Sequence, residues 1–224
     1  MGNKTAVRRL VDLLMTVVLI LLMAYFLTDQ EIHEWLRAGM LVLFIVHHIL
    51  NRKWLKALNQ GKYTSFRALQ TALVLLVLLC MLGSMLSGIW MSRYVFDFLP
   101  TQGHMGLART AHLLCAYWGF LLLSAHLGLH WGMVLGAVRK AAGNRKPSAL
   151  RTAVLRVLTC GISAYGVFAF IKHQITDYLF LQSHFVFFDY EQPPALYFLD
   201  LLAMLGLCIA ISYYLGRVLQ RWTN

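Results

Sequence analysis

Residues 109–132 read "RTAHLLCAYWGFLLLSAHLGLHWG", an apolar stretch that carries His112, His126 and His130. About 20 apolar residues are enough to cross the hydrocarbon core of a bilayer. Ionisable side chains inside a membrane are costly, and they usually face a bundle interior, a charged partner or a cofactor. The stretch therefore predicts a membrane helix whose histidines have a function.

The composition of the whole chain is that of a membrane protein. Of its 224 residues 59% are hydrophobic and 13% are charged, whereas soluble domains have about 25% charged residues. Six apolar runs predict an all-α, six-helix transmembrane bundle: 10–28, 33–51, 69–91, 109–135, 153–171 and 197–216. No polar block is long enough for a separate soluble domain, so residues 1–224 are expected to form one membrane domain. The first run lacks a small-residue cleavage site and is expected to remain uncleaved.

The net charge of +11 reflects topology rather than a nucleic-acid partner. Eight of the nine acidic residues, all but Asp12, fall at or near the side opposite to most basic residues. The positive-inside rule then places both termini in the cytoplasm, where the basic loops can meet anionic lipid headgroups. The basic residues on that side are Lys4, Arg8, Arg9, Arg52, Lys53, Lys56, Lys62, Arg67, Arg139, Lys140, Arg145, Lys146, Arg151, Arg156, Arg217 and Arg221.

Two pairs of histidines share one spacing. His33 and His47 are 14 residues apart, and so are His112 and His126. In a helix, 14 residues leave a net rotation of roughly 40° and a separation of about 21 Å along the axis. The two helices run in the same direction because one helix intervenes. We therefore expect His33 and His112 at the outer depth of the membrane, and His47 and His126 at the inner depth.

Matched histidines on two facing helices are typical of haem ligation, because a haem iron takes one axial ligand from each side of the macrocycle. The pattern predicts two haems, an outer one and an inner one. Arg37 and Arg109 each lie about one turn from an outer histidine and could face the anionic propionates. The four cysteines form no CxxCH motif, which excludes a covalently attached c-type haem.

Two other histidines are secondary candidates. His130 lies on the same face as His112 but about 27 Å further along the axis, one turn below His126. We expect it to contact a propionate, a lipid or a quinone. His48 points about 100° away from His47 and is expected at an interface between helices. Three more, in the outer loops, are expected to be solvated: His104, His173 and His184.

Other readings of the histidines remain open at this point. Membrane histidines also serve as hydrogen-bond partners between helices, as proton relays or as ligands in zinc and copper transport. A transport pathway would favour carboxylates near the midplane, and the apolar runs lack them there. The small residues of "LGSMLSGIW", 82–90, suit either close helix packing or a flat cofactor. The aromatic segment 174–198 is expected to lie in the membrane interface or to fold over the bundle.

Two quoted segments carry a family resemblance: "HEWLRAGMLVLFIVHHILNRKW", 33–54, and "RTAHLLCAYWGFLLLSAHLGLHW", 109–131. Over roughly residues 10–135 the chain resembles the flavinylation-associated cytochromes of bacteria, and its histidine spacings resemble those of ferric-reductase-like cytochromes. Residues 136–224 resemble an extension found in some members. The resemblance implies a four-helix core with non-covalent haem b, a location in the bacterial inner membrane, and extracytoplasmic partners that carry covalent FMN.

The sequence thus predicts a dihaem cytochrome b that passes electrons between a cytoplasmic-side or quinol donor and an extracytoplasmic flavoprotein. It shows no nucleophile–base pair, phosphate loop or dinucleotide fingerprint, so we expect an electron-transfer subunit rather than a stand-alone enzyme. Two alternatives are kept. One is a quinone-linked anchor subunit of a respiratory oxidoreductase, and the other is a haem-free membrane transporter.

Overall fold

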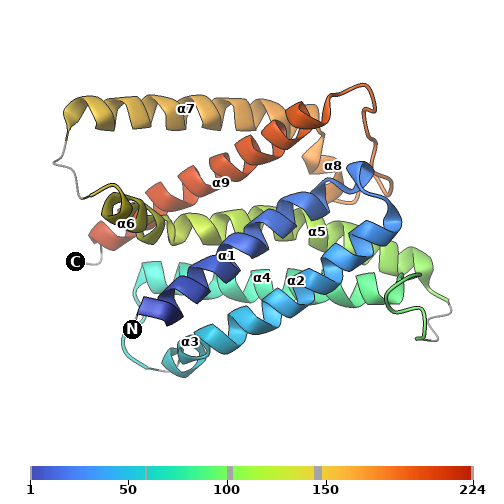
Figure 1. Cartoon of the computed structure of the whole chain (residues 1–224). Helices are drawn as coiled ribbons and strands as arrows, with labels where there is room; N and C mark the ends of the chain where they lie inside the picture. The colour runs from blue at the N-terminus through green and yellow to red at the C-terminus, as the bar shows by residue number, and fades with distance from the viewer. Residues whose placement is uncertain (1, 59, 100–102, 144–147, 223–224) are drawn as a thin grey trace.

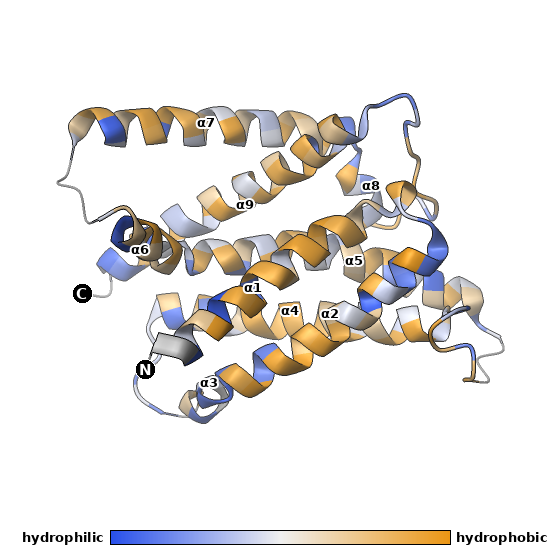
Figure 2. Ribbon diagram, in the orientation of Figure 1, coloured by the Kyte–Doolittle hydropathy of each residue, from blue (hydrophilic) through white to orange (hydrophobic). Residues whose placement is uncertain are grey.

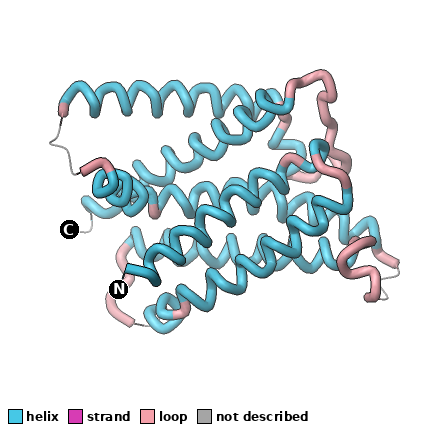
Figure 3. Tube along the Cα trace, in the orientation of Figure 1, coloured by secondary structure: helices cyan, strands magenta, loops and turns pink. Residues whose placement is uncertain are grey.

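Helices are the only regular elements in the residues that the computed structural model describes, 2–58, 60–99, 103–143 and 148–222 (Figure 3). The all-α prediction is therefore confirmed. Along the chain they are α1 (Gly2–Met23), η1 (Tyr25–Leu27), α2 (Gln30–Asn51), α3 (Lys53–Ala57), α4 (Ser65–Trp90), α5 (Met105–Leu129), α6 (Trp131–Ala141), α7 (Ala149–Lys172), α8 (Ile175–Leu179) and α9 (Pro194–Trp222).

Polar side chains fix where several long helices begin. The Asp29 side chain accepts a hydrogen bond from the backbone N–H of Ile32 at 2.8 Å at the start of α2. Thr64 and Ser148 cap α4 and α7 in the same way. Such caps satisfy backbone N–H groups that have no partner inside the helix. As a result, α4 and α7 begin a full turn before the apolar runs that predicted them.

In the part of the chain that the structure describes, four helices are long and apolar enough to cross a membrane: α4, α5, α7 and α9. This supports a multi-pass membrane protein. The helices α1 and α2 have 22 residues each but are not in this class. Charged residues explain the difference, because α1 carries Arg8, Arg9 and Asp12, and α2 carries several charged residues in its first turns. Four of the six predicted spans thus correspond to helices of this class, and the count of six is not confirmed.

The run 109–135, predicted as one helix, is two helices. The helix α5 ends at Leu129, His130 has the non-helical angles φ −94° and ψ 0°, and α6 leaves in a new direction (Figure 1). Close packing accompanies the break, since a Cβ on Gly128 would lie 2.6 Å from the backbone oxygen of Ile209 in α9. Apolar periodicity continues through the break, so the sequence pattern could not locate it.

The long helices pair as hairpins around α5. The chain folds α1 back on α2 and α4 back on α5, and α9 packs against both α5 and α7 (Figure 1). Between α2 and α4 contacts are few. The two hairpins α1–α2 and α4–α5 therefore stand slightly apart, and the space between them becomes the site described below.

One end of the bundle carries the basic segments. The start of α1, the end of α9, α3 and α6 all lie there, while apolar residues dominate the long helices between the ends (Figures 1 and 2). Arg52, Lys53 and Lys56 lie at or in α3, and Arg139 and Lys140 end α6. The predicted basic residues Arg145 and Lys146 lie outside the described residues. This arrangement agrees with a single basic side.

The aromatic segment after α7 folds over the opposite end of the bundle. Trp118 Nε1 donates a hydrogen bond to the backbone oxygen of Leu179 at 3.0 Å, and the rings of Tyr117 and Tyr178 stack at 4.5 Å. Tyr178 and Leu179 are buried. The segment therefore folds over the bundle, as one of its two expected placements had it, and it packs on side chains of α5.

A buried carboxylate fastens this cover to α9. Asp200 is fully buried and accepts hydrogen bonds from Tyr165 Oη, Lys172 Nζ, His173 Nε2 and Gln192 Nε2 at 2.5 to 2.9 Å. His173 is therefore bonded to a buried acid, and the expectation that it is solvated is wrong. An isolated acid inside an apolar helix, as in "FLDLLA", is the signal that could have revealed this cluster.

Replacement of Asp200 by alanine is expected to lower the free energy of unfolding by about 3 kcal/mol or more, because the partly exposed Lys172 and three other donors lose a fully buried acceptor. Denaturant titration in detergent micelles measures this. The exposed Asp97 is a control, and its alanine variant should stay within about 0.5 kcal/mol of the parent. Equal losses in both variants would contradict the bracing role of Asp200.

Candidate functional site

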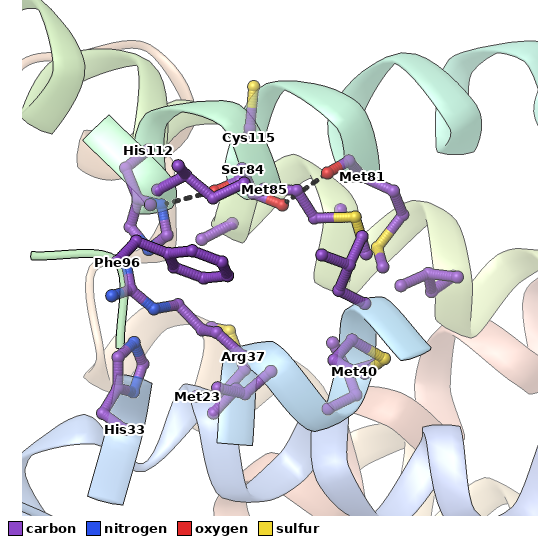
Figure 4. Close-up of a pocket in the computed structure, with 18 residues that line it drawn as sticks. Met23, His33, Arg37, Met40, Met81, Ser84, Met85, Phe96, His112 and Cys115 are labelled. Atoms are coloured by element: carbon purple, nitrogen blue, oxygen red, sulfur yellow. Dashed lines mark hydrogen bonds between the residues drawn. The ribbon is translucent and has the colours of Figure 1, made fainter. Parts of the chain in front are cut away.

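A cavity of about 760 Å³, including its open part, lies between the α1–α2 and α4–α5 hairpins (Figure 4). One end holds the polar side chains of His33, Arg37 and His112. The rest is apolar and rich in methionine, with Met23, Met40, Met81 and Met85 in its lining.

The predicted outer histidines meet at this cavity. His33 of α2 and His112 of α5 have ring centres 6.4 Å apart, with ring planes at 78°. Two imidazoles that bind one metal from opposite sides, with bonds of about 2 Å each, have ring centres roughly 6 Å apart. The separation of these two rings is therefore compatible with shared coordination of a single ion.

His112 is oriented as metal-ligating histidines usually are. Its Nδ1 donates a hydrogen bond to the backbone oxygen of Ser84 at 3.0 Å, and the Ser87 hydroxyl lies 3.2 Å from the same atom. Because a carbonyl only accepts, Nδ1 carries the proton and Nε2 keeps its lone pair. A backbone carbonyl on the second nitrogen is the common support of a ligating imidazole.

Two predicted ligands carry buried nitrogen atoms without a partner. Among the described residues, the buried side-chain nitrogen and oxygen atoms that make no hydrogen bond are His33 Nδ1, His126 Nδ1 and Arg8 Nε. Buried polar groups are rarely left unpaired in proteins. The unpaired atoms of His33 and His126 lie on rings that the sequence assigns to two different haem irons, so these residues fit the predicted group.

Arg37 reaches into the cavity, and Arg109 does not. In Figure 4 the Arg37 side chain runs to the space between the His33 and His112 rings, and its NH2 lies 3.8 Å from Glu34 Oε1. Arg109 instead lies over the ring of Phe185 at 5.8 Å and is absent from the cavity lining. Of the two cations predicted near the outer pair, the structure brings only Arg37 into the cavity.

Two glycines of α4 have different neighbours, and the first shows the close helix packing expected for this stretch. A Cβ on Gly83 would lie 2.5 Å from Cys115 Sγ, so this glycine permits close packing of α4 on α5. A Cβ on Gly88 would lie 2.6 Å from Arg37 NH1, and Gly88 lines the cavity. Gly83 is therefore a packing residue, and Gly88 makes room for the cation of the site.

Glu34 holds the outer loop against this site, and sequence reasoning missed it. Its buried carboxylate accepts hydrogen bonds from Ser92 Oγ at 2.6 Å and from the backbone N–H groups of Arg93, Tyr94 and Val95. Phe96, the residue directly after this group, lines the cavity. Glu34 thus ties the residue next to His33 to the loop that closes one side of the site.

The predicted inner pair has a carboxylate partner. His47 Nδ1 donates a hydrogen bond to Asp12 Oδ1 of α1 at 2.9 Å. His126 lies close enough to His47 and Asp12 to interact with both electrostatically. Neither His47 nor His126 lines the cavity of the outer pair. Asp12, an acid inside an apolar run on the basic side, was visible in the sequence but received no role there.

The secondary candidates have other partners. His48 Nδ1 donates a hydrogen bond to the backbone oxygen of Phe44 at 2.8 Å, within its own helix. His130 sits at the break between α5 and α6, where the side-chain amide of Gln70 donates to its Nε2 at 3.3 Å. The His126 and His130 rings are 4.8 Å apart. His130 therefore lies beside His126 of the inner pair, but His126 is inside α5 and His130 is the residue after its end.

Comparison of this chain with protein-family models, with curated proteins and with solved structures finds no match.

Proposed function

We propose that the chain is a dihaem cytochrome b of the bacterial inner membrane that passes electrons between a quinol or cytoplasmic-side donor and an extracytoplasmic flavoprotein. One observation carries the proposal. His33 and His112 face each other at 6.4 Å across a largely apolar cavity, and the Ser84 carbonyl frees His112 Nε2 for a metal. The flavoprotein partner rests on the family resemblance.

The chain would hold the two groups with four imidazoles. His33 and His112 would bind the outer haem iron, and His47 and His126 the inner one. A bound haem supplies a one-electron carrier inside the apolar bundle. Arg37 would give up its place between the outer rings and pair with the propionates at the polar end of the cavity. Asp12 would hold the His47 ring through its Nδ1–H.

Six membrane spans follow from this proposal, with α1 and α2 as the two polar ones. Two of their charged groups have internal partners that offset part of the cost of a lipid environment. Asp12 is paired with His47, and Glu34 is 2% exposed and bonded to the loop at 92–95. The basic end then faces the cytoplasm and contains both termini.

A pyridine haemochrome assay on purified protein tests the proposal. We expect two non-covalent haem b groups per chain, extracted by acidic acetone, with six-coordinate low-spin spectra. A spectrum without haem bands after expression with haem precursors would favour the haem-free transporter instead. Co-purification of an iron–sulfur or molybdenum subunit in place of an FMN protein would favour the quinone-linked anchor subunit.

The two outer arginines provide a separate prediction. Arg37→Gln should lower the reduction potential of the outer haem or weaken its retention, because the propionates lose the cation that lines the cavity. Arg109→Gln is the matched variant and should have the smaller effect, since Arg109 contacts Phe185. Redox titration of the haem absorbance measures both. Equal effects of the two variants would contradict the assignment of Arg37.

A further inference from the structure

Arg8 lies beside the inner histidine pair, toward the basic end of the bundle. Its Nη2 donates a hydrogen bond to the backbone oxygen of Leu50 at 2.7 Å, and Leu50 is three residues after His47 in the last turn of α2. On α1, Arg8 is one turn before Asp12, which accepts the hydrogen bond of His47. Residues four apart share a face of a helix. The side of α1 that carries Arg8 and Asp12 therefore meets the last turns of α2 (Figure 1).

The guanidinium of Arg8 has an unpaired donor and no acidic partner among the described residues. Its Nε is buried and makes no hydrogen bond. Asp12 is the one acidic residue of α1, but its carboxylate bonds to His47 and forms no ion pair with Arg8. Buried donors are rarely left unpaired, and a partly buried cation gains more from a nearby anion than an exposed one does. The Arg8 guanidinium is therefore suited to an anionic oxygen acceptor.

Arg8 differs in this respect from the other described basic residues at the same end. Arg9, its neighbour in the chain, and Arg52, which follows α2, are both exposed. Arg67 is partly buried, but it donates to four backbone oxygens in the loop before α4. Within the described part of the chain, Arg8 alone combines partial burial beside the inner pair with an unpaired donor.

We propose that Arg8 binds a propionate of the inner haem through its unpaired Nε. This inference rests on the proposed function, in which His47 and His126 hold the inner iron. Propionates are the anionic part of a haem, and an anion in a membrane protein is least costly near water and basic side chains. Arg8 lies one turn from His47 in that direction. A guanidinium is also the side chain whose planar fork matches a carboxylate best.

Two other roles of Arg8 make different predictions. A structural brace between α1 and α2, through the bond to Leu50, would support haem binding whether or not the haem carries carboxylates. A phospholipid phosphate is another anionic oxygen at the basic end of a membrane protein. The burial of Nε favours the haem, because a haem lies inside the bundle whereas a headgroup stays at its surface.

Haem titration of the full-length chain tests the inference, with protohaem and protohaem dimethyl ester as the two ligands. The ester has the same macrocycle without free carboxylates, and the His112→Ala background confines binding to the inner site. Arg8→Gln retains a donor for Leu50. It should raise the dissociation constant of protohaem about 10-fold or more and that of the ester less than about twofold. The exposed Arg9→Gln is the matched control and should change both constants less than about twofold.

The two ligands separate the possible outcomes. If Arg8→Gln weakens both ligands equally, Arg8 is a brace, and if it weakens neither, Arg8 does not bind haem; both results overturn the inference. Native mass spectrometry of the same proteins examines the lipid. Loss of bound phosphatidylglycerol in Arg8→Gln, with unchanged protohaem affinity, also overturns the inference and assigns a lipid phosphate to Arg8. A parent chain that binds neither haem overturns the cytochrome proposal as well, whereas any of the former results leaves that proposal standing.

Discussion

Replacement of His33 or His112 by alanine is expected to remove one of the two haems. Each variant should retain one haem b per chain, because the inner ligands lie about 21 Å away along their helices and are untouched. Loss of one axial imidazole also leaves an apolar cavity with a single ligand for the macrocycle. The pyridine haemochrome ratio measures the change, from two per chain to one.

His48→Ala is the matched control for these variants. His48 lies on the same helix as His33, is partly buried and donates to the backbone oxygen of Phe44. Its alanine variant should keep both haems. A second test replaces His33 by glycine and adds free imidazole, which should restore the outer haem if ligation is the lost function. If His33→Ala and His112→Ala both retain two low-spin haems, the outer pair does not bind iron.

The histidine spacing predicted the outer pair because the physics involved is local. A net rotation of roughly 40° over 14 residues places the two histidines of each pair on one face of their helix, and the equal spacing puts His33 and His112 at one depth. Tertiary packing then needs only to bring two parallel helices face to face. The two rings do meet at 6.4 Å, although the helices that carry them are separated by other segments of the chain.

Features that depend on contacts distant in the sequence could not be predicted in this way. The direction of Arg109 depends on Phe185, a residue of the cover that lies 76 positions later in the chain. The Asp200 cluster draws donors from α7, from its end and from the segment before α9. Helical periodicity does not predict contacts between residues so far apart in the sequence. An isolated acid in an apolar run shows that a partner exists, but it does not show which one.

The inner site has one feature that local helix geometry predicted and one that it did not. Helical phase predicted that His126 follows His112 on one face, and the structure keeps both residues in α5. Continuous phase beyond Leu129 was a wrong assumption, because the chain turns at His130. His130 directly follows the last residue of α5, so the expected depth of about 27 Å still holds for it, while its role has to be judged from its contacts.

Replacement of His126 by alanine is the second decisive change, and it should remove the inner haem. His126 is buried in the last turn of α5, its Nδ1 has no partner, and it lies near His47. His130 instead stands outside the helix, and the Gln70 amide already occupies its Nε2. His130→Ala should therefore retain both low-spin haems, with slower reduction from the cytoplasmic side at most.

Asp12→Asn joins these two variants in one experiment. It removes the charge that holds His47 Nδ1–H, and carboxylates bonded to the second nitrogen of a ligating histidine typically contribute about 10- to 100-fold in metal affinity. We therefore expect partial loss of the inner haem and an unchanged outer haem, measured by haemochrome ratio and low-temperature spectra. If His130→Ala loses the inner haem while His126→Ala keeps it, the ligand is on the far side of the helix break. In that case the turn at His130, rather than the regular phase of α5, positions the inner iron.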